Sequence, residues 1–564
     1  MYTVRKNPPK EVQNALQKYD IRTQRLLYAR NITTQEEAEA FFKKEWIAIE
    51  TQQYKNIKKA VGRILDAVEK EEMIGIFSDY DCDGIPAAAA LYTTLHALGH
   101  RRITYYVPDR NSEGFGLNKK GIKKMAANNA SVVCVLDCGT ASPEEVADME
   151  QKGMHTIIID HHLADETEPN AFAMINPTVE GVEQPHPCAA GVTYIVIQEI
   201  IREAQRRENI QKPPIGWEKW QLDIVGLATL SDMVPLRGIN RQLAHYGLQV
   251  LRKSPRPGIQ ALCDVLRLDQ QKVTQDDLSF LIIPRINAAS RMGGAETAFK
   301  LLTTSSTTEA AQLARTLTEL NNKRKTAVAT MTKAAQKQAE SKGKEKAVWV
   351  FGNREWKPSL VGLVAQKIAE TYRKTVFVWG QGGTEEKAVI KGSCRSKEHN
   401  VFSLMKNTPE VFTEAGGHKQ AGGFTLAHGA EVSLEDALNQ TASKQEQEVS
   451  AHEMVVDNEC TISEVADVYK LYEQFAPFGV QNEVIRIAIP QCTIHKKSMF
   501  GKKKEHVRYT LTDGTGYLDG IAFFAKENKE VHAEPGQTLR AVVGCVEMDT
   551  YRRKIQIRVI RCIP

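Results

Sequence analysis

Three aspartates alternate with other residues in one short segment, Asp79-Tyr80-Asp81-Cys82-Asp83-Gly84. Clustered carboxylates repel one another, so such a cluster is costly unless a cation neutralises it. Gly84 would let the backbone turn there. These residues alone leave two interpretations open, a metal site or a solvated acidic turn.

A second motif, Asp160-His161-His162, follows an aliphatic run that ends at Ile159. One buried structural histidine and one exposed histidine would explain it. A histidine that binds metal, next to a histidine that contacts a phosphate, would explain it equally well. Imidazole combined with carboxylates suits Mn²⁺ more than Mg²⁺, which prefers oxygen ligands and retained water.

The elements around these motifs predict how they are positioned. Short apolar runs at 73–77, 131–136 and 156–159 indicate buried strands, and helices are expected at 85–98 and 143–152. Strands that alternate with helices predict a parallel sheet of βαβ units. The fold class is therefore α/β in this part of the chain.

Each of the three expected strands leads into an acid, namely Asp79, Asp137 and Asp160. Ligands of open parallel sheets bind outside the carboxyl ends of the strands, so these acids are expected to meet. Asp232 adds a carboxylate at a loop position. Asp223 lies among apolar residues of an expected helix and is interpreted as structural.

The size and composition indicate a multidomain protein with free thiols. A chain of 564 residues exceeds a single core, so two to four domains are expected. Its ten cysteines include no Cys-x-x-Cys pair, which predicts reduced thiols and a cytoplasmic location. The N-terminus has no signal-peptide pattern, and no apolar run approaches the ~20 residues of a membrane span. The net charge of +5 permits nucleic-acid binding without requiring it.

The rest of the chain divides by composition. Alanine, lysine and glutamine dominate a segment expected to be a long connecting helix, and five short β-like segments near the C-terminus suggest a small barrel. The predicted domains are a helical N-terminal arm at 1–55, a catalytic domain at 56–304, the connecting helix at 305–345, a second α/β domain at 346–430, a linker at 431–451 and a barrel domain at 452–564.

The order and spacing of these motifs resemble the DHH phosphoesterase superfamily, and within it the RecJ-type exonucleases specific for single-stranded DNA. Asp79–Gly84, Asp137, Asp160-His161-His162 and Ser231-Asp232 are similar to the first four motifs of that family. The stretches 284–292 and 416–424 are similar to its Arg-x-Asn-Ala-Ala-Gly-Arg motif and to the Gly-Gly-His motif of the accessory DHHA1 domain. The C-terminal segment resembles an oligonucleotide-binding (OB) barrel.

Some positions depart from the family pattern. Cys82 replaces an alanine and Ser290 replaces a glycine, and the stretch 477–482 keeps only part of a Pro-Phe-Gly-x-Gly-Asn-Pro pattern. Such divergence fits an accessory copy carried by a mobile element as well as a housekeeping enzyme.

The resemblance implies two divalent cations, Mn²⁺ or Mg²⁺, and a function for each motif residue. The implied metal ligands are Asp81, Asp83, Asp137, His161 and Asp232. Asp79 and Asp160 would support the site closely, and His162 would lie beside the substrate phosphate. Two metals ~3.5–4 Å apart can activate a water and stabilise both oxygens of an in-line displacement.

Several residues are implied or expected to bind the DNA strand. Arginine forks grip phosphates in a bidentate manner, although a surface salt bridge is the commoner fate of an arginine. By resemblance, Arg110, Ser393 and Arg395 would recognise the 5′-terminal phosphate and set a 5′→3′ polarity. Arg285, Arg291 and His418 are the other candidates for substrate binding.

The expected barrel carries basic residues near aromatic ones, a combination that suits single-stranded nucleic acid. A solvated basic hairpin would look the same in sequence. The first cluster comprises Lys496, Lys497, Lys502, Lys503, Lys504 and Arg508 around Phe500 and Tyr509, and a second cluster surrounds Tyr551.

Three functions compete. The first is a 5′→3′ exonuclease that releases 5′-mononucleotides from single-stranded DNA in repair and recombination. The second is a phosphodiesterase for short oligonucleotides or cyclic dinucleotides, which would need no long basic groove. The third is an inactive DNA-binding scaffold, against which the complete acid set argues. The expected partners are single-stranded DNA and a single-strand-binding protein or helicase, with no membrane, and the chain is expected to be a monomer.

Overall fold

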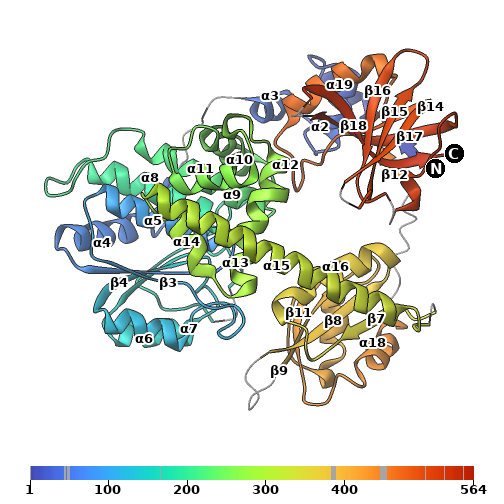
Figure 1. Ribbon diagram of the computed structural model, residues 1–564. Coiled ribbons are helices and arrows are strands. Elements are labelled where there is room, and N and C mark those ends of the chain that lie inside the picture. The colour runs from blue at the N-terminus through green and yellow to red at the C-terminus, as the bar shows by residue number, and fades with distance from the viewer. Residues whose placement is uncertain are drawn as a thin grey trace. The chain divides into compact units, whose positions relative to one another are not determined.

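The computed structural model describes residues 2–43, 46, 51–164, 167–343, 345–382, 389–444, 454–501, 503–525, 528–549 and 552–564. The chain divides into two units, coloured by residue number in Figure 1. The large unit comprises Ile49–Asp232 and Tyr246–Ser450. The small unit gathers Met1–Ala48, Met233–His245 and Ala451–Pro564.

A five-stranded parallel sheet forms the first half of the large unit, in the order β3-β2-β4-β5-β6. The three strands predicted from sequence are β2, β4 and β5. The strands β3 and β6 were not predicted, because each has only three or four residues and no distinct apolar run. The bounds are β2 Met73–Ser78, β3 Ile103–Tyr106, β4 Ala130–Leu136, β5 His155–Ile159 and β6 Ala173–Ile175.

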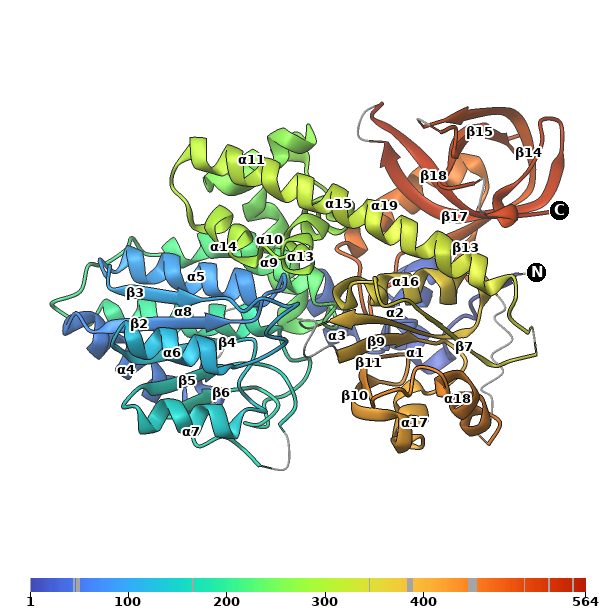
Figure 2. The same ribbon diagram turned by 60° about the horizontal axis from the view of Figure 1, so that its bottom comes forward.

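Helices cover both faces of this sheet (Figure 2). One face packs on α6 (Lys119–Ala127) and α7 (Pro143–Gln151) through an apolar core that includes Phe77, Met125 and Met149. The other face is covered by α4 (Ile57–Glu69), α5 (Gly84–Ala97) and α8 (Ala189–Ala204). Because both faces are buried, the strands are nearly continuous apolar runs rather than alternating ones.

A helical region follows the sheet. Its helices include α9 (Leu222–Ser231), α11 (Pro257–Leu266), α13 (Ile283–Met292) and α14 (Ala295–Thr303). Helix α10 (Gly238–Leu251) begins in the small unit and belongs to the large unit from Tyr246 onward. The predicted connecting helix is α15, Thr307–Ala339. It packs on α11, α13 and α14 and then on α16, so it contacts both halves of the large unit.

The second half of the large unit is a mixed sheet in the order β10-β11-β9-β8-β7. Only β7 and β8 pair in parallel, and the other neighbours are antiparallel. The bounds are β7 Val348–Gly352, α16 Pro358–Tyr372, β8 Thr375–Gly382, β9 Val389–Arg395, α17 Val401–Lys406, β10 Phe412–His418 and β11 Ala421–Leu426.

The linker predicted at 431–451 is wrong for its first part, because Leu434–Ala442 form helix α18. Leu434 and Leu438 are fully buried in the core of this half, and Asn439 exchanges hydrogen bonds with the backbone of Val348 on β7. The polar composition concealed a helix that needs only one apolar stripe to pack. Residues 445–451 lie outside the described residues.

The small unit contains the predicted barrel. Five strands close on themselves in the order β14-β15-β16-β18-β17, with β17 pairing back to β14. The short strand β13 (Asn458–Glu459) and helix α19 (Val465–Phe475) precede the barrel. The strand bounds are β14 Arg486–Phe500, β15 His506–Thr512, β16 Tyr517–Ala522, β17 Thr538–Asp549 and β18 Lys554–Ile563.

The N-terminal arm belongs to the small unit. Its helices are α1 (Lys10–Ala15), α2 (Ile21–Tyr28) and α3 (Gln35–Phe42), and α3 begins at a capping box on Thr34. Strand β1 (Tyr2–Val4) pairs in parallel with β12 (Met454–Val456). The buried Arg30 donates to Asn482, and Arg241 donates to carbonyls of Phe41 and of residues 474–477. The arm therefore packs on the barrel domain, far from it in sequence.

Candidate active site

The acids that follow the parallel strands lie together at one edge of the sheet. The amides of Asp79, Asp137 and Asp160 each donate to a carbonyl of the neighbouring strand at 3.0–3.1 Å, which continues the pairing one residue beyond β2, β4 and β5. Asp137 has a left-handed backbone with φ of +61°. This conformation is uncommon for a residue other than glycine and occurs often at functional sites.

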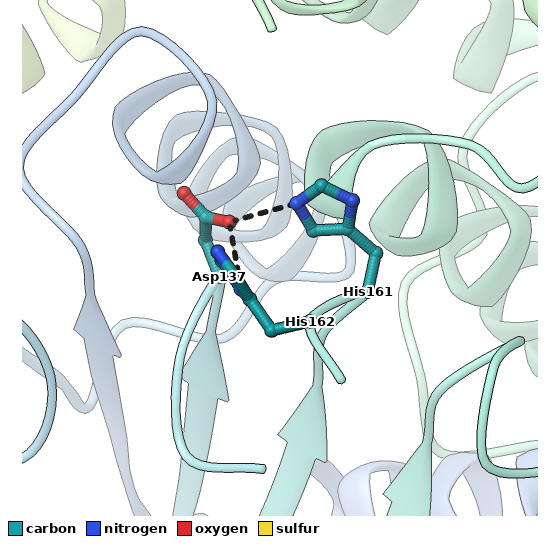
Figure 3. Close-up of side chains that lie close together, drawn as sticks. All are labelled: Asp137, His161 and His162. Carbon is teal, nitrogen blue, oxygen red and sulfur yellow. Dashed lines mark ion pairs between the residues drawn. The ribbon is translucent and has the colours of Figure 1, made fainter. Parts of the chain in front are cut away.

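His161 lies at the centre of the carboxylates. Its Nε2 is 3.5 Å from Oδ1 of Asp137 and 3.8 Å from Oδ2 of both Asp83 and Asp232. Nδ1 of His162 is 3.9 Å from the same Asp137 oxygen. Figure 3 shows both imidazoles converging on the Asp137 carboxylate.

All five predicted metal ligands fall within groups whose donor atoms lie within 4.8 Å of one another. Two further residues belong to these groups: Asp79, expected only to support the site, and His162, expected to lie beside the substrate phosphate. The groups are Asp137 with His161 and His162, Asp83 with His161 and Asp232, and Asp79 with Asp81 and Asp137.

The turn after β2 is held rigidly by backbone amides. Oδ1 of Asp81 accepts from the amides of Asp83 at 2.8 Å and Gly84 at 3.3 Å. The two oxygens of Asp83 accept from the first two amides of α8 at 2.7 and 2.8 Å. A Cβ at Gly84 would lie 2.5 Å from the carbonyl oxygen of Asp79. Glycine is therefore required because the backbone of Asp79 approaches it closely, and not because the chain turns there, as the sequence suggested.

Asp160 orients the two histidines. Its Oδ1 accepts from the amides of His161 and His162 at 2.7 and 3.3 Å and lies 2.8 Å from Nδ1 of His162. Its other oxygen accepts from the amide of Thr140 at 3.3 Å. Asp160 is completely buried and belongs to none of the three groups. This placement matches the supporting position that the resemblance implies, although the function itself remains a prediction.

The protonation equilibria reflect the crowding of negative charge. Burial raises the pKa of Asp79, Asp83 and Asp137, and the neighbouring aspartates raise it further. Burial, followed by repulsion from Asp83, raises the pKa of Asp232 to about 9. Carboxyls that resist ionisation in this way are stabilised as carboxylates when a cation lies between them.

The two histidines have opposite shifts. Burial lowers the pKa of His161, which favours the neutral imidazole that a metal requires. Burial would also lower the pKa of His162, but its hydrogen bond and charge interaction with Asp160 outweigh burial and raise it to about 9. Asp160 therefore favours the cationic form of His162, whose side chain is 44% exposed.

The residues present fit divalent cations. Oδ1 of Asp79 is buried without a hydrogen-bond partner and belongs to a residue grouped with Asp81 and Asp137. A buried carboxylate oxygen without a partner is costly unless an ion completes it. A set of carboxylates with an imidazole suits Mn²⁺ and also accommodates Mg²⁺.

The predicted arginines differ in their availability. The Arg110 guanidinium lies 5.0 Å from the centre of the Tyr80 ring, within the acidic turn. Arg285 donates to Oγ1 of Thr318 at 3.1 Å and to a carbonyl one turn earlier, so it joins α13 to α15. Arg291 donates to the carbonyl of Ser359 at 2.7 Å, and burial, followed by Arg110, lowers its pKa to about 9.

Ser393 and Arg395 lie together on β9, whereas His418 ends the neighbouring hairpin. Nη1 of Arg395 donates to Oγ of Ser393 at 2.9 Å, and this hydroxyl donates to the carbonyl of Gly422 at 2.9 Å. His418 is exposed on β10 opposite Ala421. The geometry is compatible with the predicted phosphate contacts but does not test them.

Two asparagines that the sequence analysis did not single out as site residues complete the surroundings. Nδ2 of Asn176 donates to the His162 carbonyl at 2.8 Å and to Oγ1 of Thr140 at 3.0 Å. Oδ1 of Asn287 accepts from the amide of Cys82 at 3.0 Å. Asn176 directly follows β6, so its strand-end position was the signal that could have revealed it.

In the barrel, Tyr509 corrects one expectation. Its ring is completely buried and its hydroxyl donates to the Val531 carbonyl at 2.8 Å, so it cannot stack on a base. Phe500 lies near the surface with Arg508 5.4 Å from its ring centre, and the exposed Phe523 is 6.4 Å from it. The basic residue Lys502 and the aromatic Tyr551 lie outside the described residues.

Comparison with known proteins places these domains in one family. Family models match the DHH family N-terminal domain at residues 73–229, the DHHA1 domain at 344–447 and the RecJ OB domain at 456–561. The chain is 28% identical over 548 residues to the single-stranded-DNA-specific exonuclease RecJ of Bacillus subtilis, covering 95% of this chain and 67% of that protein.

Two solved structures share the fold. The crystal structure of RecJ from Thermus thermophilus with Mn²⁺ has a TM-score of 0.78 at 21% identity and covers 98% of this chain and 77% of that one. A crystal structure of an exonuclease RecJ bound to manganese has a TM-score of 0.61 at 26% identity and covers 72% of this chain and all of that one.

The chain belongs to the DHH–DHHA1 phosphoesterases that carry a RecJ-type OB domain. It is a metal-dependent nuclease, and its acidic cluster has a ligand set suited to Mn²⁺ or Mg²⁺, the ions present in two crystal structures of Thermus thermophilus RecJ. The predicted family, fold class, enzyme class and cofactors are thereby confirmed. In the described part of the chain, no helix is long and apolar enough to cross a membrane.

Proposed function

We propose that this nuclease degrades single-stranded DNA from the 5′ end, in DNA repair or recombination, and releases 5′-mononucleotides by a two-metal mechanism. The observation that carries the proposal is the convergence of His161 with Asp83, Asp137 and Asp232 at the carboxyl ends of the parallel strands. The RecJ-type barrel in the same chain favours a strand of nucleic acid over a small phosphate ester.

Each residue of the site has a proposed function in this reaction. Bound divalent cations would supply an activated water and neutralise charge on the phosphate. Asp81, Asp83, Asp137, His161 and Asp232 hold them, and Asp79 supports the cluster. Nδ1 of His162 lies 2.8 Å from Oδ1 of Asp160, which favours the cationic ring. Nε2 of that ring is proposed to donate to a phosphate oxygen.

The polarity depends on where the terminal phosphate binds. The guanidinium of Arg110 lies over Tyr80 of the acidic turn, and Arg395 forms a hydrogen-bonded pair with Ser393 on β9. Together they are proposed to bind the 5′-terminal phosphate, with Arg285, Arg291 and His418 contacting the strand beyond it. Arg285 donates to Thr318 and to a backbone carbonyl, and Arg291 donates to the carbonyl of Ser359. Their contacts with phosphate would therefore use the N–H groups that remain.

The location and partners belong to the same proposal. All ten cysteines are free and buried, which suits the reducing cytoplasm. We propose that the enzyme is a monomer and that it acts together with a single-strand-binding protein or a helicase.

The direct test is digestion with Mn²⁺ of 5′- or 3′-labelled single-stranded DNA, duplex DNA and short RNA. The proposal requires loss of the 5′ label first and slow cleavage of duplex. Loss from the 3′ end would refute the polarity, and equal cleavage of duplex would refute the strand specificity. Preferred cleavage of the short RNA would support the small-substrate alternative.

Two variants test the site itself. Asp83→Ala and His161→Ala should abolish cleavage and leave binding of single-stranded DNA measurable, because the barrel is intact. Asp148→Ala is the matched control, since this acid lies on the surface of α7, where it pairs with Lys152. Turnover retained in either site variant would mean that the ligand assignment is wrong.

A further inference from the structure

An aromatic ring stands exposed beside the phosphate-binding histidine. Phe115 is 57% exposed, and its ring centre lies 5.4 Å from that of His162, with an angle of 63° between the planes. The His162 ring is in turn 4.7 Å from the His161 ring. The three rings therefore form a row that runs from solvent to the carboxylates.

The loop that carries Phe115 is held on both sides of it. Before it, the carboxylate of Glu113 accepts from the hydroxyl of Tyr106 at 2.6 Å and from Lys120 at 2.7 Å. After it, Leu117 is buried in the core beneath α6. The apolar ring between these anchored residues projects outward although the loop is not loose.

The backbone around Phe115 explains this projection. The flanking Gly114 and Gly116 have left-handed backbones with φ of +81° and +87°, which other residues rarely adopt. A Cβ at Gly114 would meet nothing within 4 Å, so conformation rather than crowding requires glycine there. The two glycines reverse the chain on each side and present the ring.

A single exposed apolar side chain is common and usually needs no explanation. Phe115 differs because its loop also supplies Arg110, whose guanidinium lies over Tyr80 in the acidic turn. One loop thus brings a phosphate-binding cation and a free aromatic face to the same site. Nucleotides offer the matching pair of a phosphate and a flat base.

We infer that Phe115 stacks on the base of the nucleotide whose phosphate lies at His162, so that this loop selects nucleotides over phosphate esters that lack a base. The inference rests on the proposed function. Stacking tolerates any sequence, because every base has a π-face. Phe115 is thus a positioning residue that sets where the phosphate stands relative to His162.

The test combines a side-chain change with a substrate change. Single-stranded DNA with a 5′-phosphate is prepared with a normal base or with an abasic tetrahydrofuran residue at each of the first three positions in turn. Phe115→Leu keeps an apolar side chain without a π-face, and Phe115→Tyr keeps the ring. Phe280→Leu is the matched control, because Phe280 is also exposed, at 62%, and lies on the helical turn Leu278–Ile282 rather than on the Phe115 loop.

Stacking of one base predicts that Phe115→Leu lowers kcat/KM on normal DNA roughly tenfold to hundredfold. At one abasic position, wild type and Phe115→Leu should have equal kcat/KM, because neither can stack there. Phe115→Tyr and Phe280→Leu should match wild type on every substrate.

An equal loss in Phe115→Leu on normal DNA and on all three abasic substrates would overturn the inference, since the ring would then act only through His162. No loss on normal DNA would overturn it as well. Wild-type protein that cleaves no single-stranded DNA would instead refute the proposed function, so the two failures are distinguishable.

Discussion

Replacing Asp232 by asparagine should change how the stability of the metal-free protein depends on pH. The pKa of Asp232 is about 9 in the folded chain and ordinarily 3.8. Between these values the unfolded chain carries the ionised form and the folded chain keeps the proton. The folded state therefore binds more protons, and its stability falls as pH rises through this range.

The expected size follows from the shift. Each pH unit within the range costs at most about 1.4 kcal/mol, so going from pH 5 to pH 8 costs up to about 4 kcal/mol. The side chain of Asp232 is a quarter exposed to solvent, and part of its pKa shift comes from repulsion by Asp83. The expected loss of unfolding free energy is therefore about 2–4 kcal/mol. In a unit of about 390 residues, such a loss lowers Tm by roughly 2–5 °C.

The assay is thermal unfolding in EDTA at pH 5, 6, 7 and 8, following the transition that Mn²⁺ shifts upward. Wild-type Tm should fall with pH, and Asp232→Asn should lose its share of that slope. With Mn²⁺ the wild-type slope should reverse, because metal and protons compete for the carboxylates. Asp148→Asn should follow wild type. An unchanged slope in Asp232→Asn, or a metal-free Tm that rises with pH, would refute the reasoning.

Three further outcomes are expected. Asp160→Asn removes the charge that holds the pKa of His162 at about 9, so the alkaline limb of the kcat profile should move to lower pH; an unmoved limb would exclude His162 as the titrating group. Arg241→Met leaves several buried carbonyls unpaired and should destabilise the small unit by about 2–4 kcal/mol, measured by denaturant unfolding; a loss under 1 kcal/mol would contradict this. Tyr509→Phe should lower the free energy of unfolding by about 1–2 kcal/mol without changing affinity for single-stranded DNA. Phe500→Leu should weaken that affinity roughly fivefold or more, measured by fluorescence anisotropy. The opposite pattern would mean that Phe500 is not part of the DNA-binding surface of the barrel.

Sequence patterns predicted the elements that carry strong local signals. The strands β2, β4 and β5 are continuous apolar runs, and an acid directly follows each one, so the meeting of Asp79, Asp137 and Asp160 followed from parallel-sheet geometry. Asp223 was correctly interpreted as structural, because it accepts from Arg256 and Ser254 in the core.

The features that escaped prediction depend on contacts distant in sequence. Nothing local distinguishes Tyr509, which is buried, from Phe500, which lies near the surface, because barrel closure decides which side of each strand faces inward. Asn287 reaches the amide of Cys82 across 205 positions, and no periodicity reports such a pair. Helix α18 was mistaken for a linker because its burial depends on β7.

The pairing of the N-terminal arm with the barrel has a consequence for the order of synthesis. Leu26, Leu27 and Phe41 emerge from the ribosome before the large unit, yet the barrel core that buries them is made after it. At about 5–20 residues per second, the intervening chain takes roughly 20–80 s to appear. During that interval the arm has an uncovered apolar face, while the large unit can already fold. A nascent chain that stops before β14 would keep that face exposed, which is the kind of surface that chaperones and proteases recognise in unfinished proteins.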